Sequence, residues 1–411
     1  MKKIELHWQI LIALAFAVII GSFTDKNTIL AGSITYFSIY DFLGKLFLNA
    51  LKMIIVPLVV SSVIVSVSGI KSNKRLGILG LKTFVYYAFT SLIAILTGLI
   101  LVNLIHPGSE TLVSQMTAKP NINGNLSDIA NVFIRMIPSN PLKAAIENQM
   151  LGLIFFSLLF GIFMRHVKED LFKTMYSFWD GILNVMLNMT DFIMKFAPIG
   201  VFALVAKVIS ETGFDSFKPL LAFFLTVLSG LAIHTFISLP LLLIFVAKIN
   251  PIKHFKAMYP ALLTAFSTSS SMATLSVTLD DAQKRASVSP DIAGFVLPLG
   301  ATVNMDGTAL YECVAAVFIA QSYGISMPIT TQFTVLLLAL LTSVGVAGVP
   351  SASLVAIIII LSAVGLPVEA IGLILVVDRL LDMTRTAVNV WSDSCGAAII
   401  SESEKKYSIS N

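Results

Sequence analysis

The segment at residues 371–400 is apolar and long enough to cross a membrane, yet it carries five ionisable side chains. They are Asp378, Arg379, Asp382, Arg385 and Asp393. A segment that crosses a bilayer must satisfy its backbone hydrogen bonds internally, which favours a helix. Charged groups at that depth are costly and usually face the interior of a helix bundle or a wet cavity. The segment therefore predicts a membrane helix whose charged groups face the rest of the protein.

The polar residues of this segment share one face of the predicted helix. They are Asp378, Asp382, Arg385, Asn389 and Asp393, with Thr386 at the edge of the stripe. At about 100° per residue their steps of four, three, four and four give a stripe roughly 80° wide. An ion-pair ladder that locks the helix to a neighbour is one interpretation. A binding stripe is favoured, because a lock needs fewer groups, and Asn389 and Thr386 add neutral ligands for a small solute.

The composition indicates a polytopic membrane protein. Of the 411 residues 56% are hydrophobic and 12% are charged, whereas soluble domains carry about 25% charged residues. The length accommodates about eight spans of roughly 20 residues. Cys313 and Cys395 both lie in apolar segments, so no disulfide framework is predicted. The net charge of +4 gives little information on partners, and no nucleic acid is predicted among them.

Six apolar segments in the first part of the chain predict ordinary spans. They lie at residues 8–23, 43–70, 76–105, 150–164, 178–208 and 220–246. The polar stretch 106–128 predicts a surface loop, and 131–143 predicts a broken or interfacial connection. Lys and Arg gather on alternate connections, and this bias marks the cytoplasmic side. Both termini are therefore predicted to be cytoplasmic, with the first segment retained as a helix rather than cleaved.

The second half of the chain does not follow the pattern of simple spans. Residues 251–279 are rich in Ser and Thr, and the charge bias predicts that both flanks are cytoplasmic, as in a re-entrant hairpin. The next span, 292–320, is interrupted at 304–308. Residues 330–365 repeat the re-entrant pattern from the outside, with Gly and Pro at 343–351 that interrupt a helix. Paired discontinuous helices indicate a transport site near the middle of the bilayer.

Several motifs resemble the dicarboxylate/amino acid:cation symporter family, which includes the glutamate and aspartate transporters. They are KMIIVPL at 52–58, APIGVF at 197–202, the serine-rich hairpin tip, NMDGT at 304–308, AGVP at 347–350 and RTAVN at 385–389. The resemblance spans nearly the whole chain. It implies an all-α polytopic membrane protein with eight transmembrane helices plus two re-entrant helical hairpins, in a glutamate-transporter-like elevator fold. It also implies a homotrimer in the plasma (cytoplasmic, or inner) membrane.

The resemblance further implies a scaffold and a mobile transport domain. The scaffold would comprise residues 1–75 and 106–216, and the transport domain residues 76–105 and 217–411. The transport domain would slide against the scaffold within each protomer.

Substrate-binding roles carry over position by position. Arg385 resembles the residue that pairs with a substrate side-chain carboxylate, which a guanidinium fork matches bidentately. Thr308 matches a helper at that carboxylate, and Asp382 matches the partner of the substrate ammonium. The α-carboxylate and its surroundings would involve Asn389, Thr386, and backbone groups of Ser271 and Val349.

Three sodium sites are implied as well. Sodium is a hard cation and prefers oxygen ligands, as calcium and magnesium do. The first site resembles Asp393 with backbone oxygens of Gly300, Asn304 and Asn389. The second resembles backbone oxygens of Thr302, Ser343, Val344 and Val346. The third resembles Tyr87, Thr90 and Ser91 with Asn304 and Asp306.

Four positions stand apart from the family pattern or differ between its branches. Ser269 stands where archaeal aspartate carriers have arginine, Met383 stands where animal glutamate carriers have one, and Ser392 stands where glycine is common. Glu312 lies four residues after Thr308 and resembles a carboxyl linked to proton coupling in animal glutamate carriers. A neutral, hydrogen-bonded structural role for Glu312 is the alternative to proton loading.

The sequence thus predicts a secondary active symporter, not an enzyme, that takes up glutamate or aspartate with sodium and, through Glu312, with protons as a further candidate. A C4-dicarboxylate symporter is disfavoured because Asp382 would repel a dianion. A neutral amino acid carrier would leave Arg385 unpaired. An intramembrane enzyme lacks a recognisable motif, and a pure anion channel would need no partner for an ammonium group.

Overall fold

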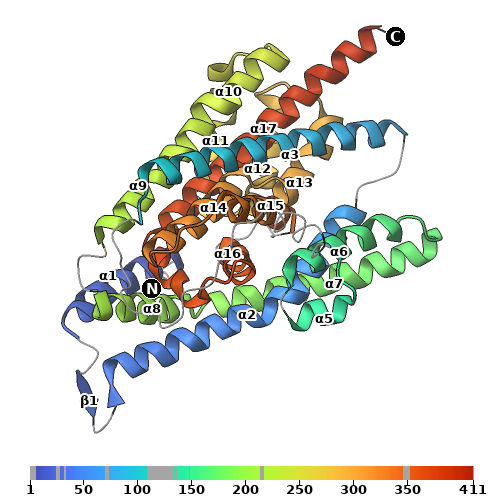
Figure 1. Cartoon of the computed structure of the whole chain (residues 1–411). Coiled ribbons are helices and arrows are strands. Elements are labelled where there is room, and N and C mark those ends of the chain that lie inside the picture. Colours follow the sequence, from blue (N-terminus) through green and yellow to red (C-terminus); the bar gives the residue numbers. More distant parts are fainter. Residues whose placement is uncertain are drawn as a thin grey trace, which may run out of the picture.

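The computed structural model describes residues 6–24, 28–31, 34–69, 74–108, 134, 137–147, 149–212, 217–345 and 352–410. These residues are almost entirely helical (Figure 1). The one sheet within them is an antiparallel pair of short strands, β1 (Ile29–Ala31) and β2 (Ile34–Thr35). A helical architecture is what the apolar segments predict, because helices satisfy their own backbone groups in lipid.

One group of helices is built along a single long helix. It contains α1 (Leu6–Ser22), α2 (Tyr36–Ser68), α5 (Pro141–Ile146), α6 (Met150–Met164), α7 (Glu169–Met194) and α8 (Ala197–Thr212). Helices α6, α7 and α8 pack on α2, and α1 packs on α8. Figure 1 shows this group in blue and green along the lower part of the molecule.

A second group surrounds a helix that is buried along nearly its whole length. It contains α3 (Lys74–Ile105), α9 (Phe217–Ile233), η2 (His234–Ser238), α10 (Leu239–Leu242), η3 (Leu243–Ala247), α11 (Pro251–Thr268), α12 (Ser271–Lys284), α13 (Pro290–Val303), α14 (Asp306–Ser322), α15 (Ile329–Gly345), α16 (Ala352–Ala363), η4 (Val368–Ala370) and α17 (Ile371–Ser410). The central helix is α14, which contacts α3, α9, α15, α16 and α17. The polar stripe predicted from the sequence lies on α17.

Two helix interruptions have clear local causes. Helices α11 and α12 form a hairpin where the sequence predicts the first one. Its tip is Ser269, which has a left-handed backbone (φ 52°), followed by Ser270, whose hydroxyl caps α12 by accepting from the Ala273 amide. Asn304 and Met305 have non-helical backbones and separate α13 from α14, as predicted for the 304–308 interruption.

Other segments differ in detail from the predictions. The span predicted at 178–208 is interrupted, because α7 ends at Met194 and α8 begins at Ala197, with a bend of 57° between them. The sixth apolar segment contains two π-helical turns, η2 and η3, that no sequence pattern indicated. The centre of the second predicted hairpin and most of the predicted 106–128 loop lie outside the described residues.

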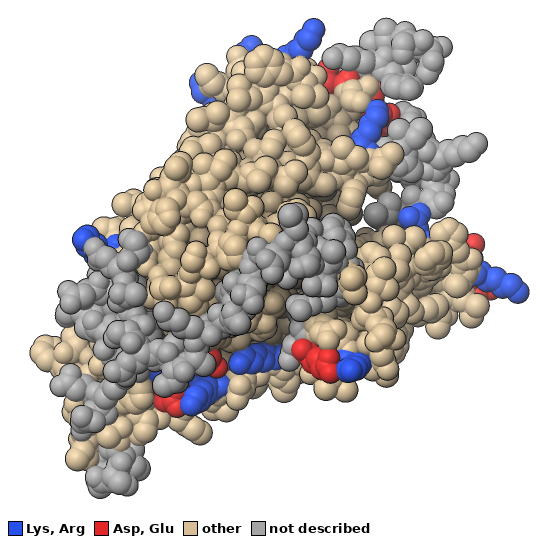
Figure 2. Space-filling view, in the orientation of Figure 1, with Lys and Arg blue, Asp and Glu red and all other residues tan. Residues whose placement is uncertain are grey.

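The described surface fits a membrane protein. Among the described residues, four helical segments are long and apolar enough to cross a membrane, or five if the bent α7–α8 pair counts as one span. The four are Tyr36–Ser68, Leu79–Ile105, Lys218–Ala247 and Pro290–Ser322. Large apolar side chains such as Phe245 are exposed, and Figure 2 shows a broad surface without charges over much of the upper part of the molecule. The chain is therefore a multi-pass helical membrane protein, while the exact number of spans stays a prediction.

We expect Gly98→Ala to destabilise the contact between α3 and α14. A methyl group at Gly98 would lie 2.9 Å from Val314 Cγ2 and 3.0 Å from Leu310 Cγ, and overpacking of this kind costs about 1–3 kcal/mol. Gly181→Ala is the matched control, because nothing lies within 4 Å of a methyl group there and alanine favours a helix by about 0.5–1 kcal/mol. Thermal unfolding of the purified variants should show a lower midpoint for Gly98→Ala alone. Equal midpoints would contradict this packing.

Candidate functional site

The side chain of Arg385 on α17 is buried and held by groups from three helices. Its Nη2 donates to Ser353 Oγ (3.0 Å), Asp378 Oδ1 (3.1 Å) and Asp382 Oδ1 (3.0 Å). The guanidinium carbon lies 3.7 Å from the ring centroid of Tyr311, a cation–π contact. Nε and Nη1 are buried without a hydrogen-bond partner among the described residues. Part of the guanidinium fork therefore remains able to bind an anion.

The carboxylates around Arg385 are themselves shared. Asp378 Oδ1 also accepts a hydrogen bond from the Tyr311 hydroxyl (2.8 Å). Asp382 Oδ2 lies 3.5 Å from Arg379 Nη1. Two arginines thus face two aspartates in a buried, roughly neutral cluster, and removal of one charge would leave another uncompensated.

Asn389, one turn beyond Arg385, connects α17 to the start of α14. Its Oδ1 accepts from the Gly307 amide (2.8 Å), and its Nδ2 donates to Thr308 Oγ1 (3.2 Å). A side chain at Gly307 would come within 2.9 Å of the Arg385 carbonyl oxygen, so glycine permits this close approach. The predicted residues Arg385, Asn389 and Thr308 are therefore brought together.

The remaining predicted substrate residues lie at the edges of this cluster. The Thr386 hydroxyl is buried and donates to the Asp382 carbonyl of its own helix (2.8 Å). Ser271 is buried at the first turn of α12, directly after the hairpin tip. Val349 lies outside the described residues.

A second buried polar cluster centres on the Asp306 carboxylate at the start of α14. Oδ1 accepts from Ser91 Oγ (2.6 Å) and Thr90 Oγ1 (3.3 Å). Oδ2 accepts from Ser392 Oγ (2.6 Å) and lies 3.1 Å from His234 Nε2, which donates to it. The sequence associated Thr90, Ser91 and Asp306, and the structure places these side chains in contact.

Asp393 lies next to this second cluster and shares Asn304 with it. Asn304 Nδ2 donates to Asp393 Oδ1 (2.9 Å) and to Ser392 Oγ (3.1 Å). A side chain at Gly300 would collide with the Asp393 carboxylate and with the Tyr87 hydroxyl, which donates to the Val296 carbonyl (2.8 Å). Asn304 Oδ1 is buried without a partner among the described residues. The first and third predicted cation sets are therefore contiguous, with a spare amide oxygen between them.

The second predicted cation set is described only in part. The hydroxyls of Thr302 and Ser343 donate to carbonyls of their own helices, Leu299 (2.9 Å) and Leu340 (2.8 Å). Val344 lies in the last turn of α15, and α15 contacts α13. Val346 lies outside the described residues. The carbonyl ligand set predicted here stays a prediction.

Glu312 is buried in α14, one turn beyond Thr308. Its Oε2 accepts from Thr342 Oγ1 (2.9 Å), and Oε1 has no partner among the described residues. A carboxyl group with one unused buried oxygen is compatible with proton loading and equally with a neutral structural role.

Sequence reasoning missed two contacts of the second cluster. His234 lies outside the polar stripe of residues 371–400, so the sequence gives it no role, yet its imidazole contacts Asp306. Ser392 was noted only as a departure from glycine, yet its hydroxyl contacts both Asp306 and Asn304. The lone histidine in the sixth apolar segment was the only available signal for the first contact.

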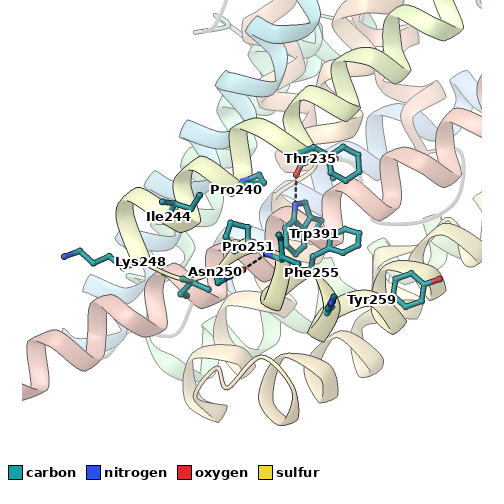
Figure 3. Close-up of a pocket in the computed structure, with 13 residues that line it drawn as sticks. Thr235, Pro240, Ile244, Lys248, Asn250, Pro251, Phe255, Tyr259 and Trp391 are labelled. Carbon is teal, nitrogen blue, oxygen red and sulfur yellow. Dashed lines mark hydrogen bonds between the residues drawn. The ribbon is translucent and has the colours of Figure 1, made fainter.

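A hydrogen bond between α17 and η2 lies beside this cluster. Figure 3 shows Trp391 Nε1 directed at the Thr235 carbonyl, at 3.2 Å, with Phe255 next to the indole. Trp391 and Phe255 pack edge to face with centroids 5.3 Å apart. They border an apolar groove of about 1080 Å³ that Pro240, Ile244 and Tyr259 also line. The groove lacks the convergent polar groups of the two clusters, so it is not the candidate site.

Comparisons with known proteins show similarity to symporters and transporters. The sequence matches the family described as the sodium:dicarboxylate symporter family over residues 6–403. It is 36% identical to the proton/sodium-glutamate symport protein of Geobacillus stearothermophilus, covering 99% of this chain and 96% of the relative. It is 35% identical to the Bacillus subtilis protein of the same name, covering 99% and 95%. Excitatory amino acid transporter 3 of Mus musculus is 35% identical, covering 97% and 86%.

We expect Asp378→Asn to destabilise the protein far more than Asp280→Asn. Asp378 faces the fully buried Arg385, and weakening a buried pair costs about 3 kcal/mol. Asp280 pairs with Lys284 on the surface, where both side chains are more than half exposed, and such pairs contribute about 0–1 kcal/mol. Thermal unfolding measures both variants. Similar midpoints would show that the Arg385 cluster does not depend on Asp378.

Proposed function

Since the chain belongs to the sodium:dicarboxylate symporter family, we propose that it is a secondary active symporter that takes up an acidic amino acid, glutamate or aspartate, with sodium and protons. No covalent chemistry is required. The names of the bacterial and mammalian relatives support the substrate class and the coupling ions. The observation that carries the proposal is the buried Arg385 guanidinium beside Asp382, since its Nε and Nη1 have no hydrogen-bond partner among the described residues.

The site would bind both ends of the substrate. The side-chain carboxylate pairs with Nε and Nη1 of Arg385, with Thr308 as a helper, because a planar fork binds a carboxylate through two hydrogen bonds. The ammonium pairs with Asp382. Asn389, Thr386 and backbone groups of Ser271 and Val349 hold the α-carboxylate region. A C4-dicarboxylate would place a negative charge against Asp382, which disfavours that alternative.

Sodium would bind at the three oxygen sets predicted from the sequence. Asp393 and Asn304 lie in one set and Asp306, Thr90 and Ser91 in another, and the hydrogen bonds through Asn304 and Ser392 join the two. The buried Asn304 Oδ1 supports a cation at their boundary, because a carbonyl oxygen without a donor is a good ligand for a hard cation. The carbonyls of Thr302, Ser343, Val344 and Val346 would supply the remaining set.

Coupling follows from shared elements and from charge. Arg385, Asn389 and Asp393 lie at one-turn steps on α17, so an anion on Arg385 and a cation on Asp393 share one rigid helix. Burying an anion and cations together costs less than burying either alone. Each therefore raises the affinity for the other, and linkage makes this effect reciprocal.

The proposed transport movement is of the elevator type, with eight transmembrane helices and two re-entrant hairpins. The scaffold comprises residues 1–75 and 106–216, and the transport domain comprises residues 76–105 and 217–411. The two helix groups described above support this division. We further propose a homotrimer whose termini are cytoplasmic. Lys and Arg gather on alternate connections between the spans, and this bias supports the orientation.

The test is uptake of radiolabelled L-glutamate and L-aspartate into proteoliposomes, with sodium and proton gradients imposed separately. Accumulation under a sodium gradient supports the proposal. Uptake of succinate without either amino acid would overturn the substrate assignment. Uptake that only equilibrates the substrate would indicate a channel.

We expect Arg385→Cys to reduce uptake of both amino acids by roughly a hundredfold or more, because truncating one partner of a buried charge pair costs several kcal/mol. Thr384→Ala is the control on the same helix, since among the described residues the Thr384 hydroxyl bonds to the Leu380 carbonyl of its own turn alone. Its uptake should match the parent protein. Glutamate uptake that survives Arg385→Cys would disprove the assigned role of Arg385.

We expect Glu312→Gln to abolish the proton dependence of uptake while sodium-driven uptake remains. Glutamine keeps an oxygen acceptor for Thr342 but carries no titratable proton. The measurement compares sodium-driven uptake with and without an imposed pH gradient. Identical pH-gradient effects in Glu312→Gln and the parent would assign Glu312 a structural role.

A further inference from the structure

Ser392 lies between the two carboxylates of the second polar cluster. Its hydroxyl donates to Asp306 Oδ2 (2.6 Å) and accepts from Asn304 Nδ2 (3.1 Å). The same Asn304 nitrogen donates to Asp393 Oδ1 (2.9 Å). Ser392 is fully buried, so a continuous chain of hydrogen bonds runs from Asp306 through Ser392 and Asn304 to Asp393.

The hydroxyl of Ser392 is used differently from those of its neighbours on α17. The hydroxyls of Thr384, Thr386 and Ser394 donate to carbonyls of the same helix. Such back-bonding is the usual choice for serine and threonine within a helix. The bonds of the Ser392 hydroxyl instead leave the helix, one of them to a carboxylate, and charge-assisted bonds of this kind are among the stronger hydrogen bonds in proteins.

The backbone around Ser392 is fixed from two sides. The Tyr86 hydroxyl on α3 donates to the Ser392 carbonyl (3.1 Å). On the other side, the Trp391 indole donates to the Thr235 carbonyl of η2. Figure 3 shows that bond. The same π-helical turn begins with His234, the second donor to Asp306 Oδ2. These backbone contacts and its own two hydrogen bonds therefore hold the Ser392 hydroxyl in a defined position.

We propose that Ser392 is a positioning residue that links two of the cation sets, because its hydroxyl fixes the Asp306 carboxylate and the Asn304 amide in one arrangement. The inference rests on the proposed sodium coupling and deepens it. Nδ2 of Asn304 is engaged by Ser392 and Asp393, and its Oδ1 is left without a partner among the described residues. Ser392 thereby selects which end of the amide is offered to a cation.

Loss of the hydroxyl has a defined consequence. Of the partners in the described part of the chain, Asn304 Nδ2 then keeps Asp393, and Asp306 Oδ2 keeps His234. The amide can rotate and present its NH₂ group where a cation needs an oxygen. Sodium binding in both sets weakens and the two sets become less dependent on each other. The Arg385 cluster, which shares none of these hydrogen bonds, retains its arrangement.

The experiment titrates sodium against purified, detergent-solubilised protein and follows thermal stability at each concentration. It compares the parent, Ser392→Ala, Ser392→Gly and the control Ser394→Ala. The control removes a buried hydroxyl two residues away, whose hydrogen bond in the described part of the chain goes to the Trp391 carbonyl of its own helix. We expect the half-saturating sodium concentration to rise about tenfold in both Ser392 variants, as for the loss of one hydrogen bond to a charged group. The steepness of the sodium dependence should also fall. Ser394→Ala should match the parent.

A second measurement distinguishes a positioning role of Ser392 from a general loss of packing. Affinity for L-glutamate at saturating sodium should stay within about twofold of the parent in Ser392→Ala, because one lost hydrogen bond outside the substrate cluster leaves that cluster intact. Equal sodium dependence in Ser392→Ala and Ser394→Ala overturns the inference. A matching loss of glutamate affinity at saturating sodium, or failure of both Ser392 variants to fold, also overturns it in favour of simple packing. A parent protein without any sodium response would instead refute the proposed function itself.

Discussion

The burial of the Arg385 guanidinium is the constraint on which the rest of the structure depends. A charge inside a membrane protein is tolerated only where the fold supplies opposite charge and hydrogen bonds. Here α17 supplies Asp378 and Asp382, α14 supplies the face of Tyr311, and α16 supplies Ser353. Three helices must meet at one point to satisfy a single side chain. These helices do not satisfy the whole guanidinium, since Nε and Nη1 remain without hydrogen-bond partners among the described residues. The two free donors could bind an anion.

The interruption between α13 and α14 allows polar groups to come together at the start of α14. A continuous helix would bury its backbone groups in its own hydrogen bonds and keep its neighbours at side-chain distance. Because α14 begins at Asp306, its first amides have no partner within the helix, and the Gly307 amide donates to Asn389. Glycine has no side chain, so the α17 backbone can approach Gly307 closely. An acidic residue in the first turn of a helix is also favoured by the helix dipole. The same break therefore positions Asp306 for one cluster and Asn389 with Thr308 for the other.

Much of this arrangement could be predicted from the sequence, and the remainder could not for physical reasons. The spacing of polar residues on 371–400 predicts a shared face, because helical periodicity is local. The direct ion pair between Arg385 and Asp382 was not predicted, since each residue was assigned to a group of the substrate. The position of the first hairpin and the break at 304–308 follow from Ser, Asn and Gly in otherwise apolar segments. His234 could not be assigned, because a π-helical turn changes the phase of a helix without a clear sequence signal. The partners of Ser392 come from residues 304 and 306, and only tertiary packing brings them together.

The distribution of charge between the two clusters explains why solute and cations should move together. Around Arg385, two arginines balance two aspartates, so the ammonium and the two carboxylates of an acidic amino acid would add one net negative charge. Around Asp306 and Asp393, the hydrogen-bonding groups that the described residues supply are hydroxyls, an amide and an imidazole, none of them a permanently charged cation. Buried carboxylates without counter-charges are costly, and cations entering this cluster would remove that cost and offset the negative charge of the substrate. Because Arg385 and Asp393 lie two turns apart on the same helix, each charge lowers the electrostatic cost of burying the other, and this mutual dependence is the physical basis of coupling.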